Sequence, residues 1–258
     1  MSAISTPTDQ DHNRYEASAF PSNSSSHEIN ISRRCYLPVS LETKPFERPM
    51  LDAVVDWISE NFNNCAVLVC DRIHRLTLQI TRNLSREEAL SEALRLGEVF
   101  IEKNEPLFQA KLAGRFKFLT CSNVMKYPKY AGYRDALSEM FYGDNKDNRD
   151  FQSSINQCAA SYVDRRFKNK GSSAYSMTRP EMMELSHQYL IEEMGLFATV
   201  IEMGWTVDVY PGEDLKTFVE IAKGKYPNAP EPLIKRKSVE LKLKTTPESK
   251  LISLPTWH

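Results

Sequence analysis

The amino-acid sequence predicts an α/β protein with a single folded domain, in which helices flank a parallel β-sheet. Two observations favour this class. Short unbroken apolar runs, typical of parallel strands buried on both faces, alternate with longer stretches of helical periodicity. The chain also has 258 residues, of which 41% are hydrophobic, and this is enough to build one full core. A wholly disordered chain is therefore excluded.

The first 30 residues are expected to form a disordered polar tail, and the folded domain is expected to span residues 31–258. The segment 1–30 is rich in Ser, Thr, Asn, Asp and Pro, and it shows neither a helical nor a strand period. Apolar patterning begins near Ile31. We therefore expect ordered structure from that residue onward.

The first half of the domain has the pattern β-α-β-α-β. Apolar runs predict strands over 35–40, 65–70 and 116–120. Apolar residues recur at helical spacing over 51–62, between the first two strands. Between the second and third strands, Ser85 and Glu88 have the spacing of a capping box, which predicts a helix to about residue 101. This alternation indicates a parallel sheet with right-handed crossovers.

The second half of the domain adds helices and two further strands. The predicted helices span about 131–142, 149–167, 178–203 and 213–223. Thr178 and Glu181 form a second capping box at the start of the longest of them. A fourth strand is predicted over 207–210. Apolar and polar residues alternate over 239–243, which predicts a last strand at an exposed edge of the sheet.

Several classes of protein are excluded by what the chain lacks. Its longest apolar run, 65–70, is far shorter than the roughly 20 residues that span a bilayer, so no membrane insertion is expected. The N-terminus has neither the basic start nor the apolar stretch of a secretory signal. The five cysteines show no CxxC spacing, and most lie in or beside apolar runs, so buried thiols are expected rather than metal ligands or disulfides. We therefore expect a cytoplasmic protein without a metal.

Two polar side chains are expected at strand ends. Ligands of open α/β sheets bind beyond the carboxyl ends of the strands, where Ser40 follows the first strand and Tyr210 ends the fourth. Each residue has an ordinary structural alternative. A lone serine at such a position more often closes a turn or caps a helix, and a lone tyrosine more often packs in the core with its hydroxyl bonded.

The helix predicted over 178–203 is apolar around most of its circumference, so it is expected to be buried. Tyr189 and Glu193 lie one turn apart on an apolar stripe, whereas Glu192 falls at the margin of the polar side. A buried carboxylate is costly unless it is paired or acts on a ligand. Glu193 therefore has either a structural partner, such as an arginine, or a role in a site that relays protons or holds an ammonium group.

In their order and spacing, these motifs resemble those of the tRNA-dependent cyclodipeptide synthases. The resemblance rests on four motifs, of which three are Tyr36-Leu-Pro-Val-Ser40, Tyr189-Leu-Ile-Glu-Glu193 and Val209-Tyr210-Pro211, and the fourth is Tyr133-Arg134. The Tyr-Pro pair is similar to one branch of the family, and Thr43 fits that branch because it stands where the other branch has asparagine. Tyr133 resembles another tyrosine of the family pocket. The resemblance runs from about Ile31 to Pro211.

Three positions depart from the family pattern. Pro38 stands in place of a glycine, and because proline has no N–H, it cannot donate to an oxyanion. Arg34 stands in place of a histidine, and Gly195 in place of a proline. Together with the long polar N-terminal segment, these differences resemble a divergent fungal subgroup that makes arginine-containing cyclic dipeptides.

The resemblance implies a Rossmann-like fold similar to the catalytic domain of class I aminoacyl-tRNA synthetases. It implies an aminoacyltransferase that joins two residues from aminoacyl-tRNAs into a cyclic dipeptide, through an aminoacyl-serine and a dipeptidyl-enzyme on Ser40. Glu193 would hold the substrate ammonium, Tyr189 would position it and relay protons, and Tyr210 would orient Ser40. No cofactor is expected, because an aminoacyl-tRNA is already an activated ester and the sequence has no ATP-binding signature.

The residues expected to bind substrate are Tyr36, Pro38, Thr43, Leu68, Asp71, Tyr133, Pro211, Glu213 and Asp214. Four acids are expected near the carboxyl ends of the strands: Asp71, Glu213 and Asp214 from this set, and Glu42, two residues after Ser40. An acidic pocket selects a guanidinium, so one of the two aminoacyl pockets is predicted to take a cationic side chain, arginine above all. The alternative is that Glu213 and Asp214 only favour the start of the following helix.

A tRNA partner requires positive surface, and the net charge of −1 leaves room for local basic patches. Basic residues cluster over 103–134, 165–170 and 235–237. The candidates for tRNA contact are Lys103, Lys111, Arg115, Lys117, Arg165 and Arg166. Any one such cluster is more often a solvated surface than a binding face. The protein is expected to act as a monomer.

Two other function classes remain open from the sequence. A non-catalytic, synthetase-like module would bind tRNA without needing Ser40 or Glu193. A serine hydrolase would need a GxSxG elbow and a histidine partner. No GxSxG occurs, and His187 projects to the side of its helix opposite Tyr189, so a hydrolase is disfavoured.

Overall fold

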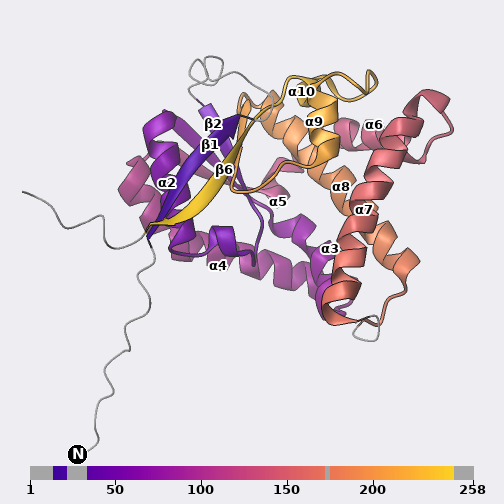
Figure 1. The fold of residues 1–258 in the computed structure, drawn as a ribbon, viewed down its shortest axis with the longest axis horizontal. Coiled ribbons are helices and arrows are strands. Elements are labelled where there is room, and N and C mark those ends of the chain that lie inside the picture. Colours follow the sequence, from indigo (N-terminus) through magenta and orange to yellow (C-terminus); the bar gives the residue numbers. More distant parts are fainter. Residues whose placement is uncertain (1–13, 22–33, 172–174, 247–258) are drawn as a thin grey trace, which may run out of the picture.

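A computed structural model of the chain describes residues 14–21, 34–171 and 175–246. These residues form a six-stranded sheet in the order β1-β6-β5-β2-β3-β4, with helices on both faces (Figure 1). Strands β6, β5, β2, β3 and β4 run parallel to one another, and β1 runs antiparallel to β6. The strands are β1 (Arg14–Pro21), β2 (Arg34–Val39), β3 (Asn64–Val69), β4 (Phe116–Thr120), β5 (Val207–Tyr210) and β6 (Lys237–Thr246). The predicted α/β class with a mainly parallel sheet is confirmed.

Helices and short helical turns connect the strands. The α-helices are α2 (Met50–Asn61), α3 (Asp71–Arg82), α4 (Arg86–Leu112), α5 (Cys121–Val124), α6 (Tyr130–Tyr142), α7 (Arg149–Lys170), α8 (Arg179–Glu202), α9 (Lys216–Ala222) and α10 (Glu231–Ile234). The 3-10 helices are η1 (Lys44–Phe46) and η2 (Lys146–Asn148). In the described ranges, no helix combines the length and the apolar character needed to cross a bilayer.

Successive side chains of the central strands point to opposite faces of the sheet, so they pack into two hydrophobic layers, one on each face. Cys35, Leu37 and Val39 of β2 pack with residues of α2 and α4. Tyr36, which points to the other face, packs with residues of α6, α7 and α8. Figure 1 shows the same division, with α2 and α4 on one side of the sheet and α6, α7 and α8 on the other.

The order of the strands creates a switch point between β2 and β5. After β2 the chain builds β3 and β4 on one side, and it later returns to place β5 and β6 on the other side. The connections that follow two neighbouring strands run to opposite sides at such a point, which opens a crevice at the carboxyl ends of these strands. Open α/β sheets bind their ligands in this crevice. Ser40 directly follows β2, and Tyr210 is the last residue of β5.

Both capping boxes predicted from the sequence are present. Ser85 Oγ accepts from the Glu88 N–H at 3.3 Å, and the Glu88 carboxylate accepts from the Ser85 N–H at 3.0 Å. Thr178 and Glu181 make the equivalent exchange at the start of α8. The first of these helices, α4, continues to Leu112, well beyond the predicted end near residue 101.

The predictions for the two ends of the chain are corrected by the structure. Residues 14–21 form β1, so a disordered tail over all of 1–30 is wrong for this segment; residues 1–13 and 22–33 lie outside the described ranges. β1 pairs with β6 from Arg14 opposite Thr246 to Pro21 opposite Val239. β6 is therefore flanked on both sides and is not an exposed edge. Ala17 and Ala19 pack against the core, but alanines give only a weak strand signal in a sequence.

Helix α3 was missing from the sequence prediction. It starts at Asp71, directly after β3, and has an apolar series, Ile73, Leu76 and Ile80, at helical spacing. This series is embedded among polar and charged residues, which masked it beside the stronger capping signal of α4. The omission matters because α3 supplies side chains to the cavity described next.

Candidate active site

A cavity of about 310 Å³ lies at the carboxyl ends of β2 and β5, walled by residues of α3, α7, α8 and α9. Ser40, Tyr189, Glu193 and Tyr210 all line it. The fold thus brings together the four residues that the sequence analysis singled out for catalysis, although they come from three separate stretches of the chain. The cavity occupies the switch point of the sheet, as expected for a ligand site.

Ser40 and Tyr210 face each other across two neighbouring strands. The Ser40 Oγ lies 3.5 Å from the Tyr210 hydroxyl oxygen, at the limit of a hydrogen bond. Thr43 Oγ1 donates to the Ser40 carbonyl oxygen at 2.8 Å and closes the turn after β2. Burial raises the pKa of Tyr210, while its contact with Ser40 acts in the opposite direction. The Tyr210 hydroxyl is therefore protonated at neutral pH and available to hold Ser40.

Tyr189 and Glu193 are in contact on α8, as their one-turn spacing predicted. The Tyr189 hydroxyl donates to Glu193 Oε1 at 3.1 Å. Burial raises the pKa of Glu193 to about 7, even though the hydrogen bond from Tyr189 lowers it. No salt bridge to Glu193 occurs among the described residues. A carboxyl group with this pKa can take up and release a proton near neutral pH.

Glu192, the neighbour of Glu193, is buried, although it was predicted at the margin of the polar side of its helix. Its carboxylate receives two hydrogen bonds from Arg75 of α3, at 2.8 and 2.6 Å, and a third from Gln188 at 2.8 Å. The arginine partner that the sequence analysis considered for Glu193 thus belongs to Glu192. The helical projection misplaced Glu192 because it could not include α3, which covers this side of α8.

Arg236 and two carboxylates form the most deeply buried polar part of the cavity wall. Arg236 donates from Nη1 to Asp214 at 2.6 Å and from Nε to Asp208 at 3.2 Å. Its guanidinium carbon lies 4.7 Å from the centre of the Phe218 ring. Burial raises the pKa of Asp208 to about 6, although Arg236 lowers it. The Oδ1 atom of Asp208 is buried without a hydrogen-bond partner among the described residues.

Sequence reasoning missed both Asp208 and Arg236. Asp208 is a single acid inside a short apolar strand. Arg236 belonged to the basic run 235–237, which was interpreted as surface, yet its side chain is only 3% exposed. No local signal distinguishes it from Lys235, because its partners are 28 and 22 residues away in the chain.

The predicted substrate-binding residues divide into two groups. Those that line the cavity are Pro38, Thr43, Glu213 and Asp214. Glu213 and Asp214 precede α9, whose N-cap is Leu215, so neither caps that helix. Among the described residues, His74 and Thr77 of α3 and Cys158 of α7 also line the cavity and were not predicted to do so.

The other predicted substrate-binding residues lie elsewhere. Tyr36 and Leu68 are fully buried core residues of β2 and β3. Tyr133 donates to Glu202 at 3.2 Å. Pro211 is buried beyond β5 without reaching the cavity. None of these four residues lines the cavity. Tyr36 and Leu68 lie inside their strands and point into the core, and a helix start alone does not determine which way the Tyr133 side chain points.

Two of the acids proposed for a cationic pocket are also used structurally. Asp71 accepts hydrogen bonds from the Ser122 N–H at 3.3 Å and the Ser122 hydroxyl at 3.1 Å, so it does not point into the cavity. Glu42 pairs with His74 and Arg82 of α3. The acidic character of the cavity therefore comes from Glu193, Asp208, Glu213 and Asp214 rather than from these two residues.

The basic candidates for tRNA contact are dispersed. Arg165 and Arg166 of α7 line the cavity, and no salt bridge to either occurs in the described part of the chain. Lys103 is exposed on α4, and Lys117 is exposed near the Trp205 ring. Lys111 forms an ion pair with Asp56 at 2.6 Å. Arg115 donates to the carbonyl oxygens of Leu112, Phe62 and Ser59, so its guanidinium group also has a structural role.

The cysteines are free thiols, and four of them are buried. Burial raises the pKa of Cys35 and Cys121 well above the ordinary value, so these thiols are not reactive thiolates. Within the described ranges, no group of three or more His, Cys, Asp or Glu side chains is arranged to hold a metal ion.

The fold and the cavity together define an α/β protein that places a serine, two tyrosines and a carboxyl group at the switch point of its sheet. No protein-family model matches the chain, and no curated protein matches it. Comparison with solved structures, by contrast, finds the same fold repeatedly in one kind of enzyme.

Several solved structures that share this fold are cyclodipeptide synthases. One from Fluoribacter dumoffii has a TM-score of 0.74 and 20% identity over 90% of this chain and all of its own. A Mycobacterium tuberculosis protein, described as demonstrating that these enzymes are related to type I tRNA synthetases, has a TM-score of 0.65 and 14% identity over 88% of this chain and 94% of its own.

A third structure, from Candidatus Glomeribacter gigasporarum, is bound to Phe-tRNAPhe. It has a TM-score of 0.60 and 16% identity over 87% of this chain and 91% of its own. At these identities the likeness establishes the fold, which is that of the cyclodipeptide synthases.

Proposed function

We propose that this protein is a tRNA-dependent cyclodipeptide synthase, an aminoacyltransferase that uses two aminoacyl-tRNAs to form a 2,5-diketopiperazine. The observation that carries the proposal is the meeting of Ser40, Tyr189, Glu193 and Tyr210 in one cavity at the switch point. The shared fold supports it. Several finer points stay predictions. They are membership of the Tyr-Pro branch or the fungal subgroup, a cytoplasmic location, a monomeric state, and the absence of a metal and a cofactor.

In the first step, Ser40 Oγ attacks the ester carbonyl of an aminoacyl-tRNA. The C–O bond to the tRNA breaks, the Ser40 proton passes to the released tRNA hydroxyl, and an aminoacyl ester of Ser40 remains. The Tyr210 hydroxyl, 3.5 Å from Oγ, orients the nucleophile. Because Pro38 has no N–H, the oxyanion must be stabilised by a donor other than residue 38.

Two further acyl transfers then complete the product. The amine of the Ser40-bound residue attacks the ester of the second aminoacyl-tRNA, which forms a peptide bond, releases the second tRNA and leaves a dipeptidyl ester on Ser40. The new terminal amine attacks that ester, closes the six-membered ring and frees Ser40. Holding both ends of the dipeptide in one cavity favours this closure.

Glu193 holds the substrate ammonium and accepts its proton. An amine must be neutral to attack an ester, and a free α-amino group has a pKa of about 8. A carboxyl group whose pKa is raised to about 7 by burial is well matched to such a transfer. The Tyr189 hydroxyl, bonded to Glu193 Oε1, positions the same group.

A cationic substrate side chain, arginine above all, fits the acid content of the cavity. Four acids, Glu193, Asp208, Glu213 and Asp214, lie on its wall, together with three arginines, Arg165, Arg166 and Arg236. A guanidinium donates in the fixed fork geometry that carboxylates accept, so it would be favoured over neutral side chains.

The arginine pair of α7 is the best-placed tRNA contact. Arg165 and Arg166 line the same cavity as Ser40, and the ester to be attacked is carried by the terminal ribose of the tRNA, next to backbone phosphates. Lys103 and Lys117 remain candidates for more distant contacts, whereas Lys111 would have to leave Asp56 first.

The deciding experiment is product analysis with purified protein and single charged tRNAs. Mass spectrometry should detect a diketopiperazine with the wild type and none with Ser40→Ala, and intact-mass analysis should detect an aminoacyl ester on the wild type only. Ser59→Ala, on α2 and outside the cavity lining, is the matched control and should keep full activity. Normal product from Ser40→Ala would exclude the covalent mechanism.

The same assay separates the alternatives. If arginyl-tRNA is left unused while two neutral aminoacyl-tRNAs are consumed, the cationic pocket is wrong and the cyclodipeptide activity stands. If tRNA binds but no species is consumed, the protein is a non-catalytic tRNA-binding module. A serine hydrolase is not favoured, because the side-chain contact of Ser40 is to Tyr210, while the cavity histidine, His74, contacts Glu42 instead.

A further inference from the structure

The turn that follows Ser40 is restrained at two points. Thr43 Oγ1 donates to the Ser40 carbonyl oxygen at 2.8 Å, so the two ends of the turn are joined. Between them, Glu42 has a φ of 58°, in the left-handed region that favours glycine. A glutamate held there needs contacts that oppose its backbone strain.

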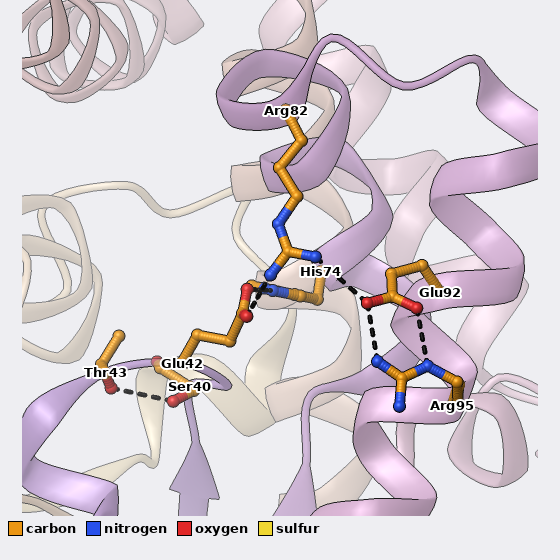
Figure 2. A network of polar contacts seen from close by, with 7 residues as sticks. All are labelled: Ser40, Glu42, Thr43, His74, Arg82, Glu92 and Arg95. Carbon is orange, nitrogen blue, oxygen red and sulfur yellow. Dashed lines mark hydrogen bonds and ion pairs between the residues drawn. The ribbon is translucent and has the colours of Figure 1, made fainter. Parts of the chain in front are cut away.

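The carboxylate of Glu42 finds such contacts on α3. Oε2 lies 3.2 Å from His74 Nε2, and Oε1 forms an ion pair with Arg82. His74 is only 7% exposed, so this partner is itself held by the surrounding protein. Figure 2 shows His74 and Arg82 converging on Glu42, with Ser40 and Thr43 beside them. The backbone after Ser40 is thereby tied to a helix distant in sequence.

Helix α4 supports the arginine of this contact. Arg82 Nη1 also donates to Glu92 Oε1 at 3.1 Å, and Glu92 receives two hydrogen bonds from Arg95, at 2.7 and 2.8 Å (Figure 2). The hydrogen bonds from Arg95 lower the pKa of Glu92 to about 2, so Glu92 is ionised at neutral pH. The series Glu42–Arg82–Glu92–Arg95 therefore connects the Ser40 turn to both α3 and α4.

We propose that Glu42 is a positioning residue for Ser40, and that His74 and Arg82 act through it. The inference rests on the proposed function, in which Ser40 is the nucleophile. The distance of 3.5 Å from Ser40 Oγ to the Tyr210 hydroxyl leaves no margin, so a small movement of the turn breaks this contact. A misplacement of about 1 Å can lower an enzymatic rate by about 100-fold.

The accessibility of the Glu42–Arg82 ion pair indicates that it orients the turn rather than stabilises the fold. The side chains of Glu42 and Arg82 are 39% and 40% exposed. Ion pairs this accessible contribute little to folding. Losing the Glu42 carboxylate should therefore lower turnover much more than it lowers the melting temperature.

The test measures the single-turnover acylation of Ser40 by an aminoacyl-tRNA, followed as release of free tRNA. We expect Glu42→Ala to lower the maximal rate constant by about 10- to 100-fold, with little change in the tRNA concentration at half-maximal rate. Glu42→Gln keeps an oxygen acceptor and should be less impaired. Glu42→Gly relieves the backbone strain but lacks the carboxylate, so it should be as slow as Glu42→Ala.

Glu87→Gln is the matched control. Glu87 is an exposed acid in the first turn of α4, outside the contacts of Figure 2, and its variant should acylate at the wild-type rate. A wild-type rate for Glu42→Ala would overturn the proposal. So would full activity of Glu42→Gly, since the backbone conformation and not the carboxylate would then be what matters.

A double-mutant cycle separates positioning from direct contact of Arg82 with tRNA. If Arg82 acts through Glu42, the double variant Glu42→Ala/Arg82→Ala is no slower than Glu42→Ala alone. If Arg82 binds tRNA instead, the two losses multiply, and the loss from Arg82→Ala appears as a higher tRNA concentration at half-maximal rate. The second result would overturn the role given to Arg82.

Hydrogen exchange tests the restraint without any substrate. Backbone amides of the turn after Ser40 should exchange faster in Glu42→Ala and Arg82→Ala than in the wild type and in Glu87→Gln. Unchanged exchange would refute the restraint even if the enzyme is active. Faster exchange in a protein that consumes no aminoacyl-tRNA would instead refute the proposed function and leave the restraint standing.

Discussion

Glu193 offers a test of the cavity that needs no substrate. Glu193→Gln replaces the carboxyl group with a neutral amide of nearly the same shape, and its oxygen can still accept the hydrogen bond from Tyr189. In the folded protein, burial raises the pKa of Glu193 from its ordinary 4.5 to about 7. Between these two values, the folded protein holds a proton that the unfolded chain has released.

This difference determines the sign and size of the effect. Because the folded state binds the extra proton, the free energy of unfolding of the wild type falls as the pH rises from about 4.5 to 7. At about 1.4 kcal/mol for each pH unit, the loss above pH 7 amounts to roughly 3 kcal/mol. Screening by solvent reduces this figure, which is therefore an upper bound.

The assay is urea denaturation of the wild type and Glu193→Gln at pH 5 and pH 8. We expect similar stabilities at pH 5, and a variant that is more stable than the wild type by up to about 3 kcal/mol at pH 8. Glu192→Gln, at the neighbouring residue, is the control, and its change in the free energy of unfolding is expected to have the opposite sign. It removes the charge that Arg75 faces, and it should be destabilised by about 3–5 kcal/mol at pH 8.

Two results would refute this reasoning. The first is a Glu193→Gln variant that is less stable than the wild type at pH 8, because this would mean that a cation pairs with the carboxylate. The second is a stability difference that does not change with pH, because this would place the pKa of Glu193 near its ordinary value.

Two further predictions concern packing around the cavity and the sheet. Arg236→Met leaves Asp208 and Asp214 buried without their shared cation, so it should lower the free energy of unfolding by about 3–5 kcal/mol. Stability should recover when both acids are also changed to Asn. An Arg236→Met variant as stable as the wild type would contradict the pairing. Gly97→Ala places a Cβ 2.7 Å from the Asp71 Cβ and should cost about 1–3 kcal/mol. In its control, Gly132→Ala in α6, the added Cβ meets no atom within 4 Å, so this variant should be more stable than the wild type by about 0.5–1 kcal/mol. Equal effects at the two glycines would show that crowding at Gly97 is not the cause.

Local patterns were sufficient for most elements and for the core of the candidate site. The central strands β2 and β3 are mostly apolar runs, and the two capping boxes specify where α4 and α8 begin. Tyr189 and Glu193 lie one turn apart, so their contact follows from helix geometry wherever the helix is placed. Ser40 and Tyr210 were predicted at strand ends, and parallel strands bring such ends to one edge of the sheet.

The sequence by itself thus determined the α/β class, the principal strands and the residues that stand at strand ends, because these depend on spacing within one segment. Only the tertiary structure decided which distant groups meet. The pairing of β1 with β6, the partner of Glu192 and the burial of Arg236 each join segments far apart in the chain. Strand pairing and buried ion pairs depend on how whole elements are placed relative to one another. No local period encodes that placement, so Asp71 and Glu42 were assigned to a pocket while the fold uses them in structural contacts.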